Sequence, residues 1–394
     1  MATVARIVSV LIAGAWFGLL FARARFWDPP CDGLCAAAPS DDAPEVHAIV
    51  PARDEAAMLA STLPALLATA YAGRFRVTLA DDGSSDGTAE LALGLAHAAG
   101  AADRFTVVRV PPRPAGWSGK VWAMAAAVAD ARAREPAPAY WFFTDADVVH
   151  DSTHVARLVA TARAEALDLI SALVELSCRS AWEKLLIPAF VFFFCKLYPF
   201  AWVADERRRT AAAAGGCMLI SNTALQRIGG IERIANALID DCALAAAVKD
   251  AGGRMRLALT TQARSIRPYN GLPEIWRMVA RSAYTQLRQS PVLLAATVMG
   301  MLALYVVPPV SAVAGVRRRD PLLALSGAAA WAMLSFAYVP ILRRYRRSPV
   351  LAPLLPLSAL LYTAMTADSA RRHARGHGGA WKGRTVTKAP PPCG

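Results

Sequence analysis

Long apolar runs occupy the start and the last third of this chain. Each is long enough to cross the hydrocarbon core of a bilayer as a helix, which takes about 20 residues. The four runs lie at residues 4–21, 291–316, 321–342 and 349–366. The first run ends in Arg23 and Arg25 with no small-residue cleavage site directly after it, which favours an uncleaved anchor over a signal peptide.

The loops between the three C-terminal runs are basic, and so is the segment after them. If all three runs crossed the membrane, one basic segment would lie outside the cytosol, which the positive-inside bias disfavours. The alternative is a re-entrant segment, for which the run with Pro308 and Pro309 is the candidate. The topology of this region therefore stays open.

Between the membrane runs, short apolar segments alternate with helical patterns. Strands are predicted at 46–50, 75–80, 105–110 and 140–144, and the helices between them at 55–70, 88–99 and 119–134. Such alternation predicts a parallel sheet with helices on both faces and a ligand crevice at the carboxyl ends of its strands. A less regular part follows, with strands at 169–176 and 255–259 and a helix at 237–251.

The composition indicates that part of the chain lies in lipid. Hydrophobic residues make up 55% of the 394 residues and charged residues only 19%, which is too apolar for a purely soluble enzyme. The net charge of +13 would suit nucleic acid, but Arg and Lys cluster beside the apolar runs, at 317–319, 343–347 and 371–375. That placement favours anionic lipid head groups over nucleic acid.

Two further segments are expected at the membrane surface. The aromatic stretch at 185–203 contains Lys196 and two prolines, which favours a surface helix over a membrane span. The amphipathic pattern at 271–288 mixes apolar residues with Arg277 and Arg281, which is typical of an interface helix.

These patterns divide the chain into six parts. They are a membrane anchor at 1–27, a Pro-rich linker at 28–44, an α/β domain at 45–268, an interface helix at 269–290, membrane segments at 291–370 and a basic tail at 371–394.

The strand predicted at 140–144 ends abruptly in Asp145-Ala146-Asp147. Neighbouring carboxylates repel each other, and a divalent cation between them and a phosphate relieves the repulsion. The alternative is a pair of solvated acids at a strand end. The apolar residues in front of the pair and the polar loops predicted beside it favour a metal site at Asp145 and Asp147.

Three other polar motifs allow two interpretations each. The loop at 81–88 is either a tight turn or a site whose carboxylates bind a base or ribose hydroxyls. Gly116-Trp117-Ser118-Gly119-Lys120 opens a helix and suits a turn or a phosphate site about equally. Asp240-Asp241 either caps a helix or supplies the base that transfer to a hydroxyl needs. The G-x-G-x-x-G and Walker patterns are absent from the sequence, which argues against dinucleotide and P-loop sites.

The order and spacing of four motifs resemble the family 2 glycosyltransferases over roughly half the chain. They are Val50-Pro51-Ala52-Arg53-Asp54-Glu55, the 81–88 loop, Asp145-Ala146-Asp147 and Asp240-Asp241. Over nearly the whole chain, further residues resemble the hopene-associated membrane glycosyltransferases of bacterial hopanoid clusters. These are the 116–120 motif, Ile187-Pro188-Ala189-Phe190, Ala214-Gly215-Gly216-Cys217 and Trp381-Lys382-Gly383-Arg384.

The resemblance implies an α/β fold, with a GT-A (Rossmann-like) nucleotide-sugar transferase domain, an N-terminal transmembrane anchor and a C-terminal transmembrane or interfacial helical region. It implies an inverting transfer from a nucleotide sugar, with a UDP-sugar expected, to a lipid acceptor in hopanoid biosynthesis. The implied location is the bacterial inner membrane, with the catalytic domain facing the cytosol.

The resemblance also assigns roles to residues. Donor binding falls to Pro51, Ala52, Arg53, Glu55, Asp81, Asp82, Lys120 and Asp145. Asp145 and Asp147 would hold Mg²⁺ or Mn²⁺ on the diphosphate. Asp241, the second acid of its pair, corresponds to the general base.

Two residues depart from the family pattern. Asp54 stands where family members usually carry Asn, and the Gln-x-x-Arg-Trp motif of processive synthases is reduced to a Gln286 without the Arg and Trp at their places. The second departure favours a single addition over polymer synthesis. Two alternatives stay open: a polyprenyl-phosphate or ceramide-type lipid glycosyltransferase, which differs only in its acceptor, and a non-catalytic subunit that binds nucleotide sugar or lipid in a membrane assembly.

Overall fold

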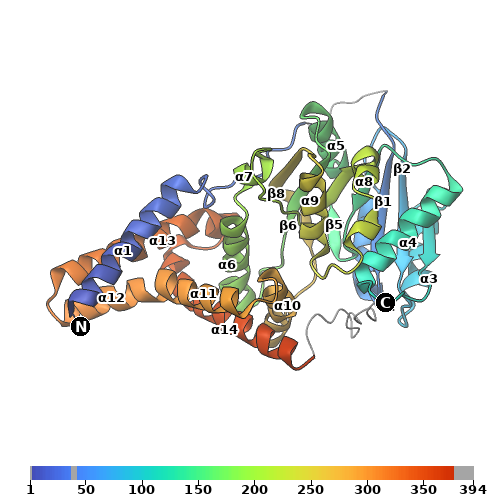
Figure 1. Cartoon of the computed structure of the whole chain (residues 1–394). Coiled ribbons are helices and arrows are strands. Elements are labelled where there is room, and N and C mark those ends of the chain that lie inside the picture. Colours follow the sequence, from blue (N-terminus) through green and yellow to red (C-terminus); the bar gives the residue numbers. More distant parts are fainter. Residues whose placement is uncertain (1, 37–41, 377–394) are drawn as a thin grey trace, which may run out of the picture. The chain divides into compact units, whose positions relative to one another are not determined.

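The computed structural model describes residues 2–36 and 42–376, which form two compact units (Figure 1). The sheet unit comprises the described residues of 30–177 and 200–267, and the helical unit comprises 2–29, 178–199 and 268–376. Both units are therefore assembled from segments that are far apart in the sequence. The Trp381-Lys382-Gly383-Arg384 motif and most of the predicted basic tail lie outside the described residues.

Eight strands form one sheet, in the order β3-β2-β1-β4-β7-β6-β8-β5. They are β1 Val46–Ala52, β2 Phe75–Asp81, β3 Phe105–Arg109, β4 Tyr140–Phe143, β5 Val148–His150, β6 Leu169–Glu175, β7 Met218–Ser221 and β8 Met255–Ser265. β1 to β4 pair in parallel, as predicted, and β1 and β2 are buried at every position because both faces of the sheet are covered.

Beyond β4, where the sequence pattern is less regular, the sheet is mixed. β7 runs antiparallel to both β4 and β6, and β5 runs antiparallel to β8. Between β6 and β7 the chain passes through residues 178–199 of the helical unit. β7 is therefore not reached by a short strand-helix-strand crossover, which is the connection that imposes parallel pairing.

Helices lie against the strands of the sheet (Figure 1). They are α2 Ala56–Leu67, α3 Thr88–Ala98, α4 Gly119–Arg134, α5 His154–Ala164, α7 Phe200–Ala204, α8 Asn222–Arg227, the short η1 Ile231–Ile234 and α9 Asp240–Asp250. The helices predicted at 55–70, 88–99 and 119–134 are confirmed to within three residues. α2 starts directly after the first polar motif, and α3, α4 and α9 start within the motifs at 81–88, 116–120 and Asp240-Asp241.

Residues 30–36 of the predicted linker are fixed to the sheet unit. Cys31 forms a β-bridge with Leu259 of β8. The Asp32 carboxylate accepts hydrogen bonds of 2.7 Å from the backbone N–H and the hydroxyl of Thr261. Arg157 of α5 donates to the Asp32 carbonyl at 3.3 Å.

The helical unit contains four stretches that are long and apolar enough to span a membrane: α1 Ala2–Ala22, Pro291–Arg317, α13 Pro321–Arg344 and Pro349–Ala374. Pro291–Arg317 joins α11 Pro291–Met301, a π-helical turn η2 Leu302–Val306, and α12 Val307–Arg317. Pro349–Ala374 joins η3 Pro349–Leu354 and α14 Leu355–Ala374. The N-terminal and C-terminal membrane segments predicted from the apolar runs are thus present as helices, and Pro308 and Pro309 begin α12 without reversing the chain.

Two shorter helices complete this unit, α6 Ala181–Leu197 and the strongly amphipathic α10 Leu272–Gln286. α6 carries Pro188, which removes one N–H from the helix. Side chains of α14 donate to the carbonyls just before it, from Ser358 to Leu185 and from Tyr362 to Leu186, both at 2.9 Å. α6 is therefore packed within the helical unit.

α12 and α13 approach each other at two glycines. A Cβ on Gly315 would lie 2.3 Å from the backbone nitrogen of Ala324, and one on Gly327 would lie 2.4 Å from that of Ala312. Small residues of this kind allow membrane helices to pack backbone against backbone.

We expect Gly327→Ala to force α12 and α13 apart, because its Cβ would meet main-chain atoms that have no rotamer to move. The expected loss is about 1–3 kcal/mol, typical of overpacking, read as a lower thermal unfolding midpoint of the detergent-solubilised protein. Gly300→Ala is the matched control, because no atom lies within 4 Å of its added Cβ. Equal midpoints for the two variants would contradict the close packing.

Candidate active site

The predicted metal pair lies in the turn between β4 and β5, and each acid is bound by a different cation. Asp145 Oδ1 accepts a bond of 2.8 Å from Lys120 Nζ. Asp147 Oδ2 lies 2.7 Å from Arg267 Nε, just beyond β8. Asp145 and Asp147 are near enough for the charge on Asp145 to act on the pKa of Asp147.

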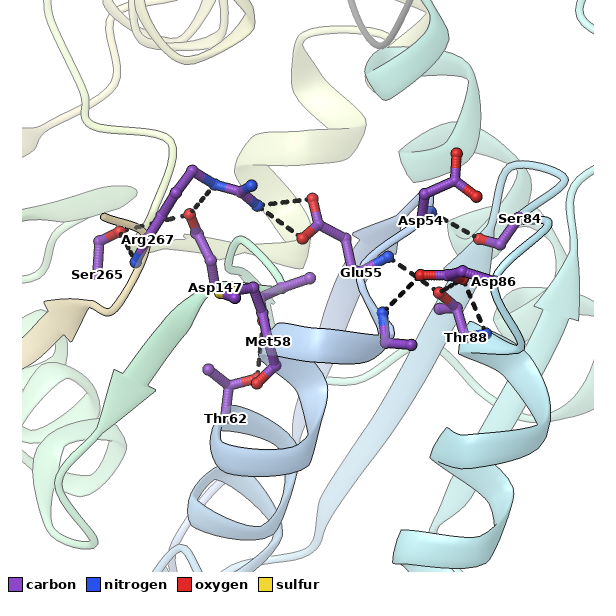
Figure 2. A network of polar contacts seen from close by, with 12 residues as sticks. Asp54, Glu55, Met58, Thr62, Ser84, Asp86, Thr88, Asp147, Ser265 and Arg267 are labelled. Atoms are coloured by element: carbon purple, nitrogen blue, oxygen red, sulfur yellow. Dashed lines mark hydrogen bonds and ion pairs between the residues drawn. The ribbon is translucent and has the colours of Figure 1, made fainter. Parts of the chain in front are cut away.

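Arg267 joins the metal pair to the first motif (Figure 2). Its Nη2 donates to both carboxylate oxygens of Glu55, at 2.7 and 2.6 Å, while Nε holds Asp147. Burial and the Asp145 charge raise the pKa of Asp147, although Arg267 opposes the shift. Glu55 and Asp147 lie more than 90 residues apart in the sequence, and the guanidinium of Arg267 connects them.

Lys120, in the first turn of α4, connects the metal pair to α9. Its ammonium lies 2.8 Å from Asp145 Oδ1 and 3.0 Å from Asp240 Oδ2. Burial disfavours its charge, but Asp145, Asp240 and Asp241 outweigh burial and hold its pKa above the ordinary value. The 116–120 motif is therefore more than a turn, because its lysine is held among three carboxylates.

Asp241, the predicted base, lies in the first turn of α9. Its two oxygens accept backbone bonds from Gly215 at 2.9 Å and from Cys242 at 2.7 Å. Burial and the neighbouring Asp240 raise its pKa to about 6, against the opposing effect of Lys120. A carboxyl titrating near neutrality is suited to accepting and releasing a proton.

Gly215 brings the base and the lysine together. A Cβ at this position would lie 3.0 Å from Lys120 Nζ and 3.4 Å from Asp241 Oδ2. Only a residue without a side chain lets the backbone N–H reach Asp241 here without displacing the ammonium. This accounts for the first glycine of the Ala214-Gly215-Gly216-Cys217 motif.

The predicted donor-binding residues of the first two motifs lie at the ends of β1 and β2. Pro51 and Ala52 pair with β2. Their side chains are apolar, so only their main-chain atoms could form hydrogen bonds to a donor. Arg53 Nη1 lies 3.2 Å from the Asp82 carbonyl and 3.3 Å from Asp82 Oδ2. Asp81 Oδ1 accepts the backbone N–H of Ser84 at 3.1 Å, which closes the turn of its own loop.

Asp54 and Asp86 lock these two loops together (Figure 2). Asp54 has a left-handed backbone, with φ of 51°, and its Oδ1 accepts the N–H of Ser85 at 2.8 Å. Asp86 Oδ2 accepts the N–H of Ala56 at 3.0 Å, in the first turn of α2. Asp and Asn are the residues other than glycine that best tolerate this backbone conformation. The Asp-for-Asn departure therefore keeps both the conformation and the acceptor oxygen.

A buried chain of hydrogen bonds supports the metal pair from behind. The single proton of Thr144 Oγ1 goes to the Gly216 carbonyl at 2.9 Å, so the bond of 2.7 Å to His150 must be donated by His150 Nε2. His150 Nδ1 then accepts from His154 Nδ1 at 3.0 Å. Burial lowers the pKa of both histidines, which keeps them neutral as this arrangement requires. Thr144, which directly precedes Asp145, is thus hydrogen-bonded to the loop that holds Asp241.

Arg267 and the Thr144 chain had not been predicted as parts of the site, and within the Asp240-Asp241 motif only Asp241 had been given a role. Arg267 and Asp147 are 120 residues apart, and Arg267 and Glu55 are 212 apart. No local spacing links them, and only the position of Arg267 just after a strand of the sheet could have indicated a site residue. Within residues 2–36 and 42–376, no three His, Cys, Asp or Glu side chains come together as a group that could hold a metal ion.

We expect Asp54→Asn to leave stability and donor affinity close to wild type, because the amide oxygen can still accept from Ser85. Asp54→Val should lower the free energy of unfolding by about 1–3 kcal/mol, since a β-branched residue is strained at positive φ. Thermal unfolding and the KM for the donor test both variants. A large loss in Asp54→Asn would instead assign a role to its charge.

Comparison with known proteins identifies the family. A family model described as "Glycosyltransferase like family 2" matches residues 44–285, which is more than half of the chain. A search of curated proteins finds no match.

Among solved structures, the chain is similar to the mannosyltransferase PcManGT from Pyrobaculum calidifontis, solved in complex with GDP-Man and Mn²⁺. The identity is 18%, the TM-score is 0.52, and the match covers 95% of this chain and 98% of that chain. It is also similar to glucosyl-3-phosphoglycerate synthase from Mycobacterium tuberculosis, with 15% identity, a TM-score of 0.39 and coverage of 66% and 87%. A third is mannosyl-3-phosphoglycerate synthase from Rubrobacter xylanophilus, with 17% identity, a TM-score of 0.37 and coverage of 62% and 75%.

The family match and the mixed sheet confirm the fold and the family that the four motifs had predicted. The chain belongs to the glycosyltransferase-like family 2 and is a glycosyltransferase with a GT-A domain.

Proposed function

We propose that this glycosyltransferase moves one sugar, with inversion, from a nucleotide sugar to a lipid acceptor in the bacterial inner membrane. The observation that carries the proposal is the position of Lys120, which holds Asp145 of the metal pair and Asp240 beside the base in one charged cluster. A UDP-sugar is the expected donor, although PcManGT was solved with GDP-Man.

Asp145 and Asp147 suit Mg²⁺ or Mn²⁺, because carboxylate oxygens are the ligands these ions prefer. Burial and the closeness of Asp145 raise the pKa of Asp147, and a divalent charge between the two acids would remove their repulsion. When bound, the ion would neutralise charge that builds on the leaving diphosphate. PcManGT was solved in complex with GDP-Man and Mn²⁺, which supports a divalent ion here.

Lys120 and Arg267 would contribute to the same neutralisation. Both are cations beside the metal pair, and a guanidinium can bind phosphate oxygens with two parallel bonds. Arg53, Glu55, Asp81 and Asp82, with the main chain of Pro51 and Ala52, would hold the nucleotide at the strand ends. The residues in these roles are the ones that the family motifs predicted, and Arg267 is added to them.

Asp241 would act as the general base. The acceptor hydroxyl oxygen attacks the anomeric carbon as the bond from that carbon to the diphosphate oxygen breaks, and the hydroxyl proton passes to Asp241. The attack comes from the face opposite the leaving group, so the configuration inverts. The two backbone N–H groups on Asp241 fix its oxygens while leaving lone pairs for the proton.

Membrane helices in the same chain favour a lipid acceptor. Four stretches are apolar enough to span a bilayer, and α10 has the amphipathic pattern of an interface helix. Basic clusters at 343–347 and 371–375 suit anionic head groups on the cytosolic side. Within this class we propose an acceptor of the hopanoid pathway, on the resemblance of the motifs, and a catalytic domain in the cytosol.

Sugar transfer should be detected by incubating membranes that contain the enzyme with a panel of radiolabelled UDP-sugars and GDP-sugars. Hopanoid alcohols, polyprenyl phosphate and ceramide are supplied in separate reactions, and the extracted lipids are analysed by mass spectrometry. We expect label in hopanoid lipids, with the activity abolished by EDTA and restored by Mn²⁺ or Mg²⁺. Label in another lipid would replace the acceptor, EDTA-resistant transfer would contradict the metal pair, and no labelled lipid with any donor would favour a non-catalytic role.

The rate should depend on the ionisation of Asp241. A base must be ionised to accept a proton, so a pKa of about 6 predicts a rate that falls as the pH drops below that value. Asp241→Asn should lower kcat about 100- to 10,000-fold, as expected for the loss of a general base. An acidic limb that persists in the residual activity of Asp241→Asn would assign the titration to another group.

A further inference from the structure

The two acids of the metal pair are already neutralised by side chains of the protein. Lys120 binds Asp145 at 2.8 Å and Arg267 binds Asp147 at 2.7 Å. Asp147 and Lys120 are shielded from water, with 14% and 19% of their side chains exposed, whereas Asp145 and Arg267 are more open, at 38% and 35%. A divalent cation arriving alone would therefore meet two fixed positive charges, of which the Lys120 ammonium is the more weakly screened by water.

Each cation is also held by a second acid, which fixes it in this position. Asp240 lies 3.0 Å from the Lys120 ammonium, and Glu55 receives two bonds from Arg267. Each cation is held between two acids, so it can leave the acid of the metal pair only if another anion takes the place of that acid. A carboxylate left without its cation in a shielded site costs free energy. The cation can therefore move only if the carboxylate gains another positive charge and the cation gains another anion.

A diphosphate with its metal ion supplies both replacements. Its oxygens offer Lys120 and Arg267 new acceptors, and the ion takes over the charge on Asp145 and Asp147. The planar guanidinium of Arg267 matches two phosphate oxygens as well as it matches the Glu55 carboxylate.

We propose that Lys120 and Arg267 are resident counter-cations that make the binding of the divalent ion depend on the diphosphate of the donor. They hold Asp145 and Asp147 until the donor arrives and then move to its phosphate oxygens. The inference rests on the proposed use of a nucleotide-sugar donor and assigns to Arg267 a role that no sequence motif indicated. Binding linkage is reciprocal, so the ion must strengthen diphosphate binding by the same factor.

The test measures Mn²⁺ binding to the full-length protein in detergent by the electron paramagnetic resonance signal of free Mn²⁺. Titrations are run without nucleotide, with UDP and with GDP, and the Mn²⁺ that each nucleotide binds in solution is measured without protein. For the wild type we expect weak binding of Mn²⁺ alone and at least about tenfold tighter binding with one nucleotide, equal to about 1.4 kcal/mol of coupling.

Arg267→Ala separates a counter-cation from a merely structural ion pair. Because it frees Asp147, it should tighten the binding of Mn²⁺ alone severalfold, and because it removes a phosphate donor, it should weaken UDP binding. Lys120→Ala should change both affinities in the same two directions. Arg227→Ala is the matched control, because Arg227 forms an ion pair of 3.1 Å with Asp168 in the same unit but lies outside the site. It should change neither affinity.

Arg267→Lys guards against a folding defect. It keeps a positive charge near Asp147 but not the planar guanidinium that holds Asp147 and Glu55 together, so Mn²⁺ alone should bind as in the wild type while UDP binds more weakly. If Arg267→Ala and Lys120→Ala leave the affinity for Mn²⁺ alone unchanged or weaken it, the counter-cation role is wrong although the proposed function stands. If the wild type binds neither nucleotide with Mn²⁺, the proposed function fails and the inference fails with it.

Discussion

The site depends on holding several carboxylates close together at one edge of the sheet. Glu55, Asp145, Asp147, Asp240 and Asp241 would repel one another, and removing each charge from water costs several kcal/mol, a magnitude typical of shielded ions. Lys120 and Arg267 make the arrangement possible because each binds two of these acids at once. The lysine joins α4, the β4–β5 turn and α9, and the arginine joins β8 to that turn and to the end of β1. The two cations therefore connect segments from the whole length of the sheet unit.

The main chain around the acids is shaped for these contacts. Gly215 has no side chain, so its N–H reaches Asp241 beside the Lys120 ammonium. Asp54 adopts a left-handed conformation that brings its carboxylate onto the second loop, and Thr144 links the metal turn to the Gly216 carbonyl. These positions contribute no charge to the reaction. They fix distances among the groups proposed to act in the reaction, which matters because a displacement of about 1 Å can cost around a hundredfold in rate.

Those parts of the structure that are encoded locally could be predicted from the sequence. The apolar runs before Asp81 and Asp145 predict buried strands, and both strands are buried. The antiparallel β7 could not be predicted, because the chain reaches it through the helical unit rather than through a short crossover. Arg267 could not be predicted as a site residue either, since its partners lie 120 and 212 residues away. Pairings of this kind are decided by the register of the sheet, which no local pattern contains.

The charged cluster and the acceptor pose different recognition problems. A diphosphate offers many oxygens to cations and a metal ion, and a site built to bind them discriminates strongly against a ligand that lacks them. A hopanoid, a ceramide and a polyprenyl chain offer mainly apolar surface, whose differences are worth only about 1–3 kcal/mol per methylene-sized feature. As the proposed base, Asp241 would meet a single hydroxyl or phosphate oxygen whichever lipid carries it. The residues that identify the donor therefore act alike on every acceptor, and selection among lipids must come from apolar side chains outside this cluster.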